Sequence, residues 1–555
     1  MQNRLALLTI IGIILRFINL SDKPPWTDEF STLVFSLGNS FLGVPLNQPI
    51  PIDTLLQPLQ PTSTTVKDVL THLFSESNHP PLYFILTHLW LKLFPSEGGL
   101  VSLWGARSLA AIFGAISVPA IYSFSFLTFR SRLVSQIAAA IMATSPFGIF
   151  LAQETRHYTL PILWVIASLA CLIIATRHLD KNTKIPIKVV AAWIAVNALG
   201  IATHYFFVLT LFAEVMVLIF LGWQQWRQKS LIFSRWWRIV AVGLGTAISG
   251  LIWVPVFLQN TYGGKLTEWI QGDRIGLAWI SPLFQAFAAW VTMLFLLPVE
   301  APNVAIMIVC GVIMLIFAIW ITPILIGGIR IRLKQPKTQL ETQILIGFIA
   351  SAIALFFFFT YFLGIDLTRG ARYNFVYFPA VIVLLGTSLA ICARAKLVKL
   401  YKWKVSGQQA IALVYLMSFL SAITVVCNLG YQKYYRPDLF VELIQNTSKV
   451  PVLIATTQKT HVHIGEMMGV ARELKIHPKP SNSLNYQFLL AHQDADPNTS
   501  TAALETTMKN LPRPLDLWMV NFYADNPKTI QICEIDKNPS FPGINGYDYK
   551  LYHCL

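Results

Sequence analysis

Charged residues are scarce in this sequence of 555 residues. Asp, Glu, Lys and Arg make up 12% of it, hydrophobic residues make up 55%, and the mean hydropathy is +0.56. Soluble domains carry about twice that share of charge, so the composition excludes a soluble protein and indicates a polytopic membrane protein. The net charge of +15 comes from short basic clusters between apolar runs. No nucleic-acid-binding motif accompanies them, so we expect no nucleic acid among the partners.

Cysteine is also scarce, with six residues at scattered positions that offer no metal-ligand spacing. Four lie in apolar runs and are expected to pack there: Cys171, Cys310, Cys392 and Cys427. Cys533 and Cys554 lie in the polar C-terminal segment and can form a disulfide if that segment is extracytoplasmic, a question that the sequence leaves open. No Gly-rich phosphate loop joins a strand to a helix, so nucleotide binding is not supported. The cofactor stays unknown, because the sequence neither indicates nor excludes a divalent metal.

Apolar runs that approach the roughly 20 residues needed to cross a bilayer recur along the chain. Eleven are predicted to cross: 5–21, 105–128, 133–151, 158–176, 189–205, 206–222, 239–258, 304–328, 344–363, 374–393 and 409–429. Two shorter runs, 80–95 and 279–297, are interrupted or flanked by proline, so each either crosses or lies in the interface. The expected class is therefore an α-helical membrane protein with about 11 to 13 spans.

Loop charge favours the model in which neither short run crosses. Five loops then share one side and carry 19 Lys and Arg against the single Asp180: 130–132, 177–188, 226–238, 330–337 and 394–404. Short cytoplasmic loops have this asymmetry. We therefore predict a cytoplasmic N-terminus, an extracytoplasmic segment after 430, and a plasma-membrane location. If both short runs cross, there are thirteen spans, but the basic loops between them face outward. Arg16, near the outer end of the first run, is expected to snorkel to the interface and to have a structural or lipid-phosphate role.

The chain is predicted to divide into a transmembrane domain, 1–429, and a small extracytoplasmic α/β domain, 430–555. Two buried strands are expected over 450–455 and 515–520, and two helices over 464–474 and 501–511. The runs 529–535 and 547–552 alternate like edge or hairpin strands. This segment carries no motif that assigns it a role.

The candidate chemistry lies in the predicted outer loops. Asp28 and Glu29 follow the first span, and adjacent carboxylates can divide the work, one accepting a proton and the other holding a metal or a donor. His79 precedes two prolines where a helix is expected to begin, with Tyr83 in the run that follows. A helix N-terminus attracts anions, so His79 is a candidate phosphate ligand. The alternatives are a solvated acidic loop and an incidental histidine.

A polar hexad, Gln153 to Tyr158, separates two predicted spans. Ionisable groups at a bilayer edge are costly, so Glu154, Arg156 and Tyr158 are candidate substrate contacts. The alternative is an ordinary loop with a Glu154–Arg156 ion pair.

Further candidates stand at the outer ends of later spans: His204, Arg369, Arg372 and Tyr373. Arginines in predicted outer loops are unusual under the positive-inside rule, and bidentate hydrogen bonding to a phosphate explains them. The alternative for Arg369 is neutralisation by Asp366.

Together these motifs resemble a known family. Asp28-Glu29, the run His79 to Tyr83, Ala106 to Leu109 and the hexad are similar, in order and placement, to the GT-C membrane glycosyltransferases of the protein O-mannosyltransferase and aminoarabinose-transferase type, over roughly residues 1 to 380. The resemblance implies transfer of a sugar, with inversion, from a polyprenyl-phosphate donor to an acceptor hydroxyl of a glycan, lipid or protein on the extracytoplasmic side.

By the same resemblance Asp28 is the general base and Glu29 supports it. His79 stands where related aminoarabinose enzymes carry a lysine that contacts the carrier phosphate, so phosphate binding here is expected to depend on protonation. Glu154 and Arg156 are expected to line the same cavity.

Two other classes stay open at this point. A transporter is expected to carry ionisable groups near the bilayer midplane, and Glu214 is the exception among spans nearly free of Asp and Glu. A polysaccharide polymerase or ligase shares outer arginines and a lipid-linked substrate, but it does not require the early Asp-Glu pair.

Overall fold

The computed structural model describes residues 2–230, 232–259, 265–272, 276–395, 398–400, 403–478, 484–496, 498–525, 530, 533–536 and 541–555. The chain divides into two compact units. The helical unit comprises Met1–Leu20, Asn78–Tyr83 and Arg107–Gln432, and the sheet unit comprises Ser21–Ser77, Phe84–Ala106 and Lys433–Leu555. The segment between the first two predicted spans therefore belongs largely to the same unit as the C-terminal segment.

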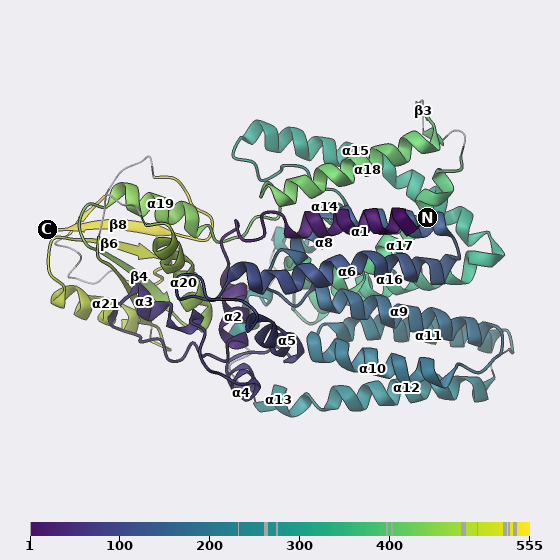
Figure 1. Ribbon diagram of the computed structural model, residues 1–555, viewed down its shortest axis with the longest axis horizontal. Coiled ribbons are helices and arrows are strands. Elements are labelled where there is room, and N and C mark those ends of the chain that lie inside the picture. Colours follow the sequence, from purple (N-terminus) through teal and green to yellow (C-terminus); the bar gives the residue numbers. More distant parts are fainter. Residues whose placement is uncertain are drawn as a thin grey trace. The chain divides into compact units, whose positions relative to one another are not determined.

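The helical unit is built from long apolar helices (Figure 1). Its α-helices are α1 (Gln2–Phe17), α6 (Leu103–Phe129, most of which belongs here), α7 (Arg132–Thr144), α8 (Pro146–Ala152), α9 (Thr159–Asp180), α10 (Ile187–Thr203), α11 (Phe207–Arg227), α12 (Phe233–Leu251), α13 (Val254–Gln259), α14 (Ser281–Leu294), α15 (Val304–Leu333), α16 (Pro336–Phe362), α17 (Phe378–Cys392) and α18 (Gly407–Val426). Short 3-10 turns are η2 (Lys265–Ile270), η3 (Gly276–Trp279), η4 (Leu367–Arg369) and η5 (Ala371–Val376), and β2 (Val398–Leu400) pairs with β3 (Trp403–Val405).

Each of the eleven predicted spans coincides with helix. Seven helices of the described chain are long and apolar enough to cross a membrane, namely α6, α9, α11, α12 (extended to Val256), α15, α16 and α18. The number is eight if the bent pair α7–α8 forms one span. The remaining predicted spans correspond to α1, α10 and α17, which have 16, 17 and 15 residues. The protein is thus an integral membrane protein, and its orientation in the membrane stays a prediction.

The bend between α7 and α8 has an identifiable cause. The two helices meet at 53°, where Pro146 starts α8 and Ser145 caps it with a side-chain bond to the Gly148 amide. Arg16 is fully buried beside the break and donates hydrogen bonds to the carbonyls of Met142 and Ala143, at 2.9 and 3.0 Å. The expectation that Arg16 snorkels to the interface is therefore wrong, because it satisfies carbonyls that the interrupted helix leaves open.

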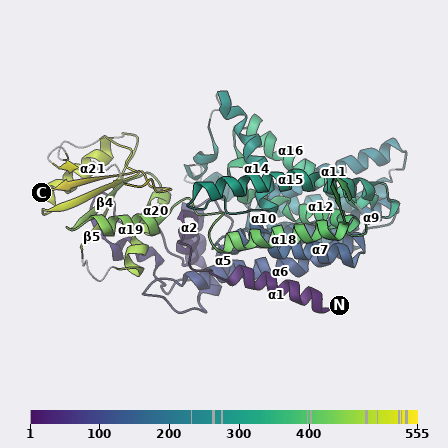
Figure 2. The same ribbon diagram turned by 90° about the horizontal axis from the view of Figure 1, so that it is seen from above.

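Small residues let α1 approach α6, and the two helices lie side by side in both views (Figures 1 and 2). A Cβ added to Gly12 would stand 3.0 Å from Val118 Cγ2, and one added to Gly114 would stand 3.0 Å from Arg16 Nε. The backbones are therefore closer than larger side chains permit.

The sheet unit contains six strands and several helices (Figure 1). Its elements are α2 (Thr27–Ser36), β1 (Pro49–Pro51), α3 (Ile52–Leu55), η1 (Gln57–Leu59), α4 (Val66–Glu76), most of α5 (Leu82–Leu91), α19 (Pro437–Thr447), β4 (Val452–Gln458), α20 (His461–Ile476), β5 (Tyr486–His492), α21 (Asn498–Asn510), β6 (Leu515–Val520), β7 (Glu534–Ile535) and β8 (Tyr549–Cys554).

The strand order is β1-β5-β4-β6-β8-β7. The three central strands β5, β4 and β6 are parallel, and the outer pairs are antiparallel. Because successive side chains of a strand point to opposite faces, Ile454 and Trp518 pack in a core with residues of α2, α19 and α20, whereas Leu453 and Leu517 pack in a second core with residues of α21. Both faces of the parallel strands are thus covered, as such strands require.

The predicted strands 450–455 and 515–520 and helices 464–474 and 501–511 are present as β4, β6, α20 and α21. The run 529–535 is described only in part, at 530 and 533–535, where β7 lies, and 547–552 overlaps β8. Cys533 and Cys554 form a disulfide with an S–S distance of 2.08 Å. The two cysteines therefore pair, and the side of the membrane on which they lie stays a prediction.

Candidate functional site

The predicted substrate residues of the helical unit come from four separate segments. His79 and Tyr83 lie at and just after the turn into α5, and Glu154, Arg156 and Tyr158 lie in the turn that joins α8 to α9. His204 ends α10, and Arg372 and Tyr373 lie in η5. The turns that interrupt these helices place polar side chains between apolar elements.

These segments bring three histidines and an arginine together. The His157 ring lies 4.4 Å from the His204 ring and 5.3 Å from the His79 ring, between centroids. Arg156 Nη2 donates to His79 Nε2 at 3.3 Å. We call His79, Arg156, His157 and His204 the imidazole cluster.

Two tyrosine side chains border the imidazole cluster. The Tyr83 ring lies 6.0 Å from that of His157, and the Tyr158 ring lies 5.5 Å from that of His204, between centroids. The Arg156 guanidinium lies 5.7 Å from the centre of the Tyr158 ring, within the range of a cation–π contact. These rings form an aromatic wall, so the polar atoms of the imidazole cluster are the groups that can recognise a ligand.

Two members of the imidazole cluster, His157 and His204, are buried and have ring nitrogens without a hydrogen-bond partner among the described residues. His157 is 0% exposed, and neither of its ring nitrogens has a hydrogen-bond partner among the described residues. His204 is buried as well; its Nδ1 accepts from the Phe206 amide at 3.0 Å, and its Nε2 has no partner among the described residues. Buried polar atoms normally have hydrogen-bond partners, so these ring nitrogens are able to bind a ligand or a water molecule.

Burial and neighbouring positive charge lower the pKa of both histidines. For His157 the loss of solvation dominates, and His204, Arg156, His79 and Arg372 add to it; for His204 the loss of solvation again comes first, followed by His79, Arg156 and Arg372. A bound anion opposes the effect of the neighbouring positive charge, because it favours the protonated form of each ring. The cluster can therefore bind an anion and take up a proton with it.

Arg372 and Tyr373 adjoin this cluster through aromatic contacts. The Arg372 guanidinium lies 5.6 Å from the Tyr373 ring centre and 5.3 Å from that of Trp269. Tyr373 packs edge to face on Phe206 at 4.7 Å, and Phe206 stacks on His204 at 5.3 Å. Arg369 is exposed; its Nε lies 3.5 Å from Asp366 Oδ2, and its Nη1 donates to the Trp269 carbonyl at 2.5 Å. Arg369 thus has the partner that the alternative interpretation expected.

Asp28 and Glu29 lie in the first turn of α2, in the sheet unit. Glu29 is fully buried and Asp28 is half-buried. Carboxylates in the first turn of a helix are favoured by its dipole. Trp26 precedes the helix, and Lys433 Nζ lies 5.6 Å from the Trp26 ring centre.

Among the described residues there is no group of three or more His, Cys, Asp or Glu side chains arranged to hold a metal ion. The identity of any cofactor stays unknown.

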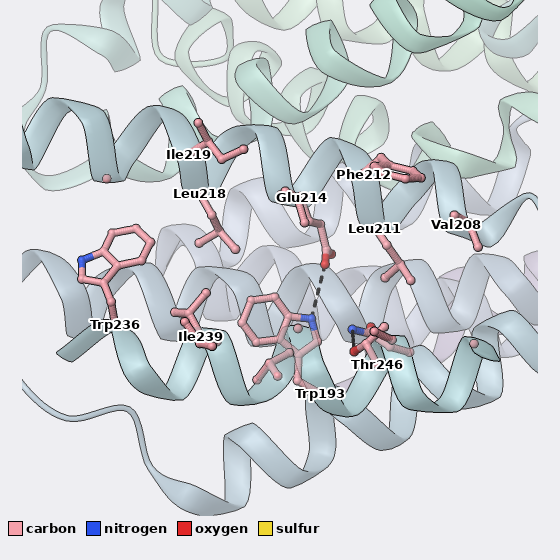
Figure 3. A pocket seen from close by; sticks show the side chains of 18 of the residues that line it. Trp193, Val208, Leu211, Phe212, Glu214, Leu218, Ile219, Trp236, Ile239 and Thr246 are labelled. Atoms are coloured by element: carbon pink, nitrogen blue, oxygen red, sulfur yellow. Dashed lines mark hydrogen bonds between the residues drawn. The ribbon is translucent and has the colours of Figure 1, made fainter. Parts of the chain in front are cut away.

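A separate cavity of about 870 Å³ lies between α10, α11 and α12 in the helical unit (Figure 3). Its wall is apolar except for a polar network at mid-depth, in which the Glu214 carboxylate accepts from Ser168 Oγ at 3.0 Å and from Trp193 Nε1 at 3.3 Å. None of the predicted site residues lines it. Asn197 joins the same network by accepting from Ser168 and donating to Thr246 on α12.

His157 was not among the predicted site residues, although it stands inside the hexad. Glu154 and Arg156 were predicted because charged groups are costly at a bilayer edge. A histidine between two polar residues shows no sequence spacing that indicates a site. The signal that identifies it is spatial, since His79 and His204 come from distant segments.

Comparison with solved structures shows the fold. ArnT from Cupriavidus metallidurans, solved bound to undecaprenyl phosphate, matches with a TM-score of 0.51 at 13% identity, over 99% of this chain and 97% of that chain. An oligosaccharyltransferase from Archaeoglobus fulgidus, in complex with Zn and sulfate, matches with a TM-score of 0.47 at 12% identity, over 98% of this chain and 72% of that chain. No protein-family model and no curated protein matches the sequence. The chain thus has the GT-C membrane glycosyltransferase fold with a small C-terminal sheet region, as its motifs predicted.

Proposed function

We propose that the protein transfers a sugar from a polyprenyl-phosphate donor to an acceptor hydroxyl on the extracytoplasmic side of the membrane, with inversion at the anomeric carbon. The observation that carries this proposal is the imidazole cluster, whose buried ring nitrogens and guanidinium suit a phosphate. The fold shared with ArnT, which was solved with undecaprenyl phosphate, supports the same class of donor.

In the proposed reaction the acceptor oxygen attacks the anomeric carbon as the bond from that carbon to the phosphate oxygen breaks. The Asp28 carboxylate accepts the proton of the attacking hydroxyl, and the electron pair of the broken bond leaves with the polyprenyl phosphate. Since a phosphate is already a competent leaving group, the protein needs mainly to orient the acceptor and neutralise the departing charge. Glu29 follows Asp28 in the sequence and is fully buried, so it supports the placement of Asp28.

Arg156, His79, His157 and His204 hold the phosphate in this proposal, with Glu154 and Arg372 beside them and Tyr83, Tyr158 and Tyr373 as the aromatic wall. Arg369 is a weaker candidate, because Asp366 already faces it. The Cys533–Cys554 disulfide supports an extracytoplasmic position for the C-terminal segment, since disulfides persist in oxidising compartments.

The test compares Asp28→Asn with the wild type in purified, lipid-reconstituted protein, using a radiolabelled polyprenyl-phosphate sugar pool as donor. The expected result is loss of transfer by a factor of about 10³ or more, with the donor still bound. Equal transfer by both proteins removes Asp28 from the mechanism. A transporter instead moves the labelled donor across the bilayer without forming a glycosylated product.

A further inference from the structure

Helix α2, which carries Asp28 and Glu29, packs closely on α20 of the C-terminal segment. A Cβ added to Gly465 of α20 would stand 3.5 Å from the Thr27 Cα, and one added to Gly469 would stand 3.6 Å from Phe30. Alanine fits there, but a larger side chain does not. Residues of both helices also share one hydrophobic core, including Phe30, Leu33, Ile464 and Met467.

His461, at the start of α20, sits among aromatic rings from the segment that follows Asp28. Its ring stacks on Phe41 with centroids 4.9 Å apart and meets Phe35 edge to face at 5.8 Å. Only 4% of His461 is exposed. The two aromatic contacts fix the plane of the imidazole, and with it the direction of its ring nitrogens.

The charged groups that act on His461 are Asp28 and His463. Burial lowers the pKa of His461 to about 4, the Asp28 carboxylate opposes that shift, and His463 adds to it. The imidazole is therefore neutral near neutral pH. A neutral imidazole can still donate one hydrogen bond, and a carboxylate is the natural acceptor for it.

A second side chain from the C-terminal segment fixes the start of α2. Lys433 is 6% exposed and lies over the Trp26 ring, and Trp26 is the residue that precedes Thr27 at the helix N-terminus. The backbone on both sides of Asp28 thus contacts residues of the segment 433–555, within one compact unit.

We propose that the C-terminal segment takes part in sugar transfer by positioning Asp28, with His461 as the residue that orients its carboxylate and Gly465 as the residue that lets α2 seat against α20. This inference rests on the proposed function, because it assigns a role to the proposed base. His461 is a positioning residue and touches no substrate in this proposal.

The principal test is a pair of substitutions that separate ring packing from hydrogen bonding. His461→Phe keeps the stack on Phe41 and removes the ring nitrogens, whereas His461→Gln keeps a donor near the position of Nε2. The first variant is expected to lower kcat by about 10-fold or more at unchanged donor KM and unchanged melting temperature, because a misplaced base slows only the chemical step. The second is expected to recover most of kcat. His477→Phe, on the exposed C-terminal end of the same helix, is the matched control.

A second measurement needs no change at His461. Gly465→Ala is expected to keep transfer near the wild-type level, and Gly465→Leu to lower kcat as His461→Phe does. The double variant Thr27→Cys, Gly465→Cys should form a disulfide on mild oxidation, detected by mass spectrometry of the digested protein. The oxidised protein is expected to stay active, because α2 remains on α20 throughout turnover.

The outcomes separate the two proposals. If Asp28→Asn abolishes transfer while His461→Phe and Gly465→Leu leave kcat unchanged, or if the locked protein is inactive, the positioning role is overturned and the proposed function stands. If Asp28→Asn leaves transfer unchanged, the proposed function fails and the positioning role fails with it. A loss of melting temperature that parallels the loss of kcat in His461→Phe assigns His461 a structural role only, and overturns the inference.

Discussion

His157 and His204 lie with their ring centroids 4.4 Å apart, although one follows α8 and the other ends α10. Two neutral imidazoles at this distance can share one bound anion, and a protonated pair without an anion repels itself. The charge of the imidazole cluster therefore depends on whether an anion is bound.

The first prediction concerns pH and donor affinity. Because burial and neighbouring positive charge lower the pKa of His157 and His204 in the free protein, anion binding takes up protons, and affinity for a phosphodiester donor rises as pH falls from about 7 to about 5.5. Equilibrium binding of the donor across this range measures the slope. A double variant, His157→Phe with His204→Phe, is expected to show a shallower slope, because only His79 then remains to titrate, and a flat wild-type curve contradicts the prediction.

The second prediction concerns Arg156. Its planar fork can bind phosphate oxygens in pairs, which lysine cannot do, so Arg156→Lys is expected to lower kcat/KM by about 10-fold or more. Arg227 is the matched control, because its guanidinium also lies over an aromatic ring, at 5.0 Å from that of Trp223, and takes no part in the cluster. Arg227→Lys should change kcat/KM by less than about two-fold. Equal effects of the two substitutions would show that Arg156 contributes packing alone.

The third prediction concerns the polar network in the cavity of Figure 3. Glu214→Leu removes an acceptor from Ser168 and Trp193 in an apolar interior. Ser168 keeps Asn197 as an acceptor and Trp193 keeps Ser168 Oγ, so the expected loss of stability is the net worth of the lost hydrogen bonds, about 1 kcal/mol. Glu214→Gln keeps an acceptor and should stay close to the wild type. Thermal unfolding in detergent distinguishes the two variants. If both melt alike, the network holds the helices together less than the hydrogen bonds suggest.

The fourth prediction concerns the disulfide. Cys533 and Cys554 are 21 residues apart, so loop-closure entropy predicts that replacing both with serine lowers the stability of the sheet unit by about 3 kcal/mol. Limited proteolysis of the full chain, followed at sites in 433–555, reports that loss. Cys427→Ser is the control, because Cys427 is exposed and carries no disulfide.

The fifth prediction concerns acid. His461 has a pKa of about 4 when folded and about 6.5 when unfolded, so the unfolded chain binds a proton that the folded chain excludes between these values. Stability from this group is therefore present above about pH 6.5 and is lost as pH falls toward 4, by about 3 kcal/mol in total. Melting temperatures from about pH 7 to 4.5 should fall less for His461→Asn than for the wild type. Parallel falls would mean that other groups dominate.

The lengths of the apolar runs were sufficient to locate the long helices of the helical unit. The lengths of α9, α11 and α15 follow from uninterrupted apolar runs, and the short α5 and α14 follow from proline. The break between α7 and α8 was not foreseen, because the run 133–151 reads as one span and only the buried Arg16 side chain shows where the open carbonyls lie.

The remaining strands, helices and site contacts could not be predicted, because they depend on residues that are far apart in the sequence. β5 and α19 gave no clear pattern, and β1 lies between two prolines, where no strand is expected. The role of His157 depends on two distant histidines, and that of His461 depends on contacts with the loop after α2. Motifs identified most of the candidate residues, but sequence alone did not show which partners surround them.

Strand β1 extends the sheet at one edge by pairing Pro49 with Leu489. The segment that carries Asp28 therefore cannot reach its final structure until β5, late in the chain, has been synthesised. A chain truncated before β5 lacks the strand that pairs with β1, so its sheet stays incomplete at that edge.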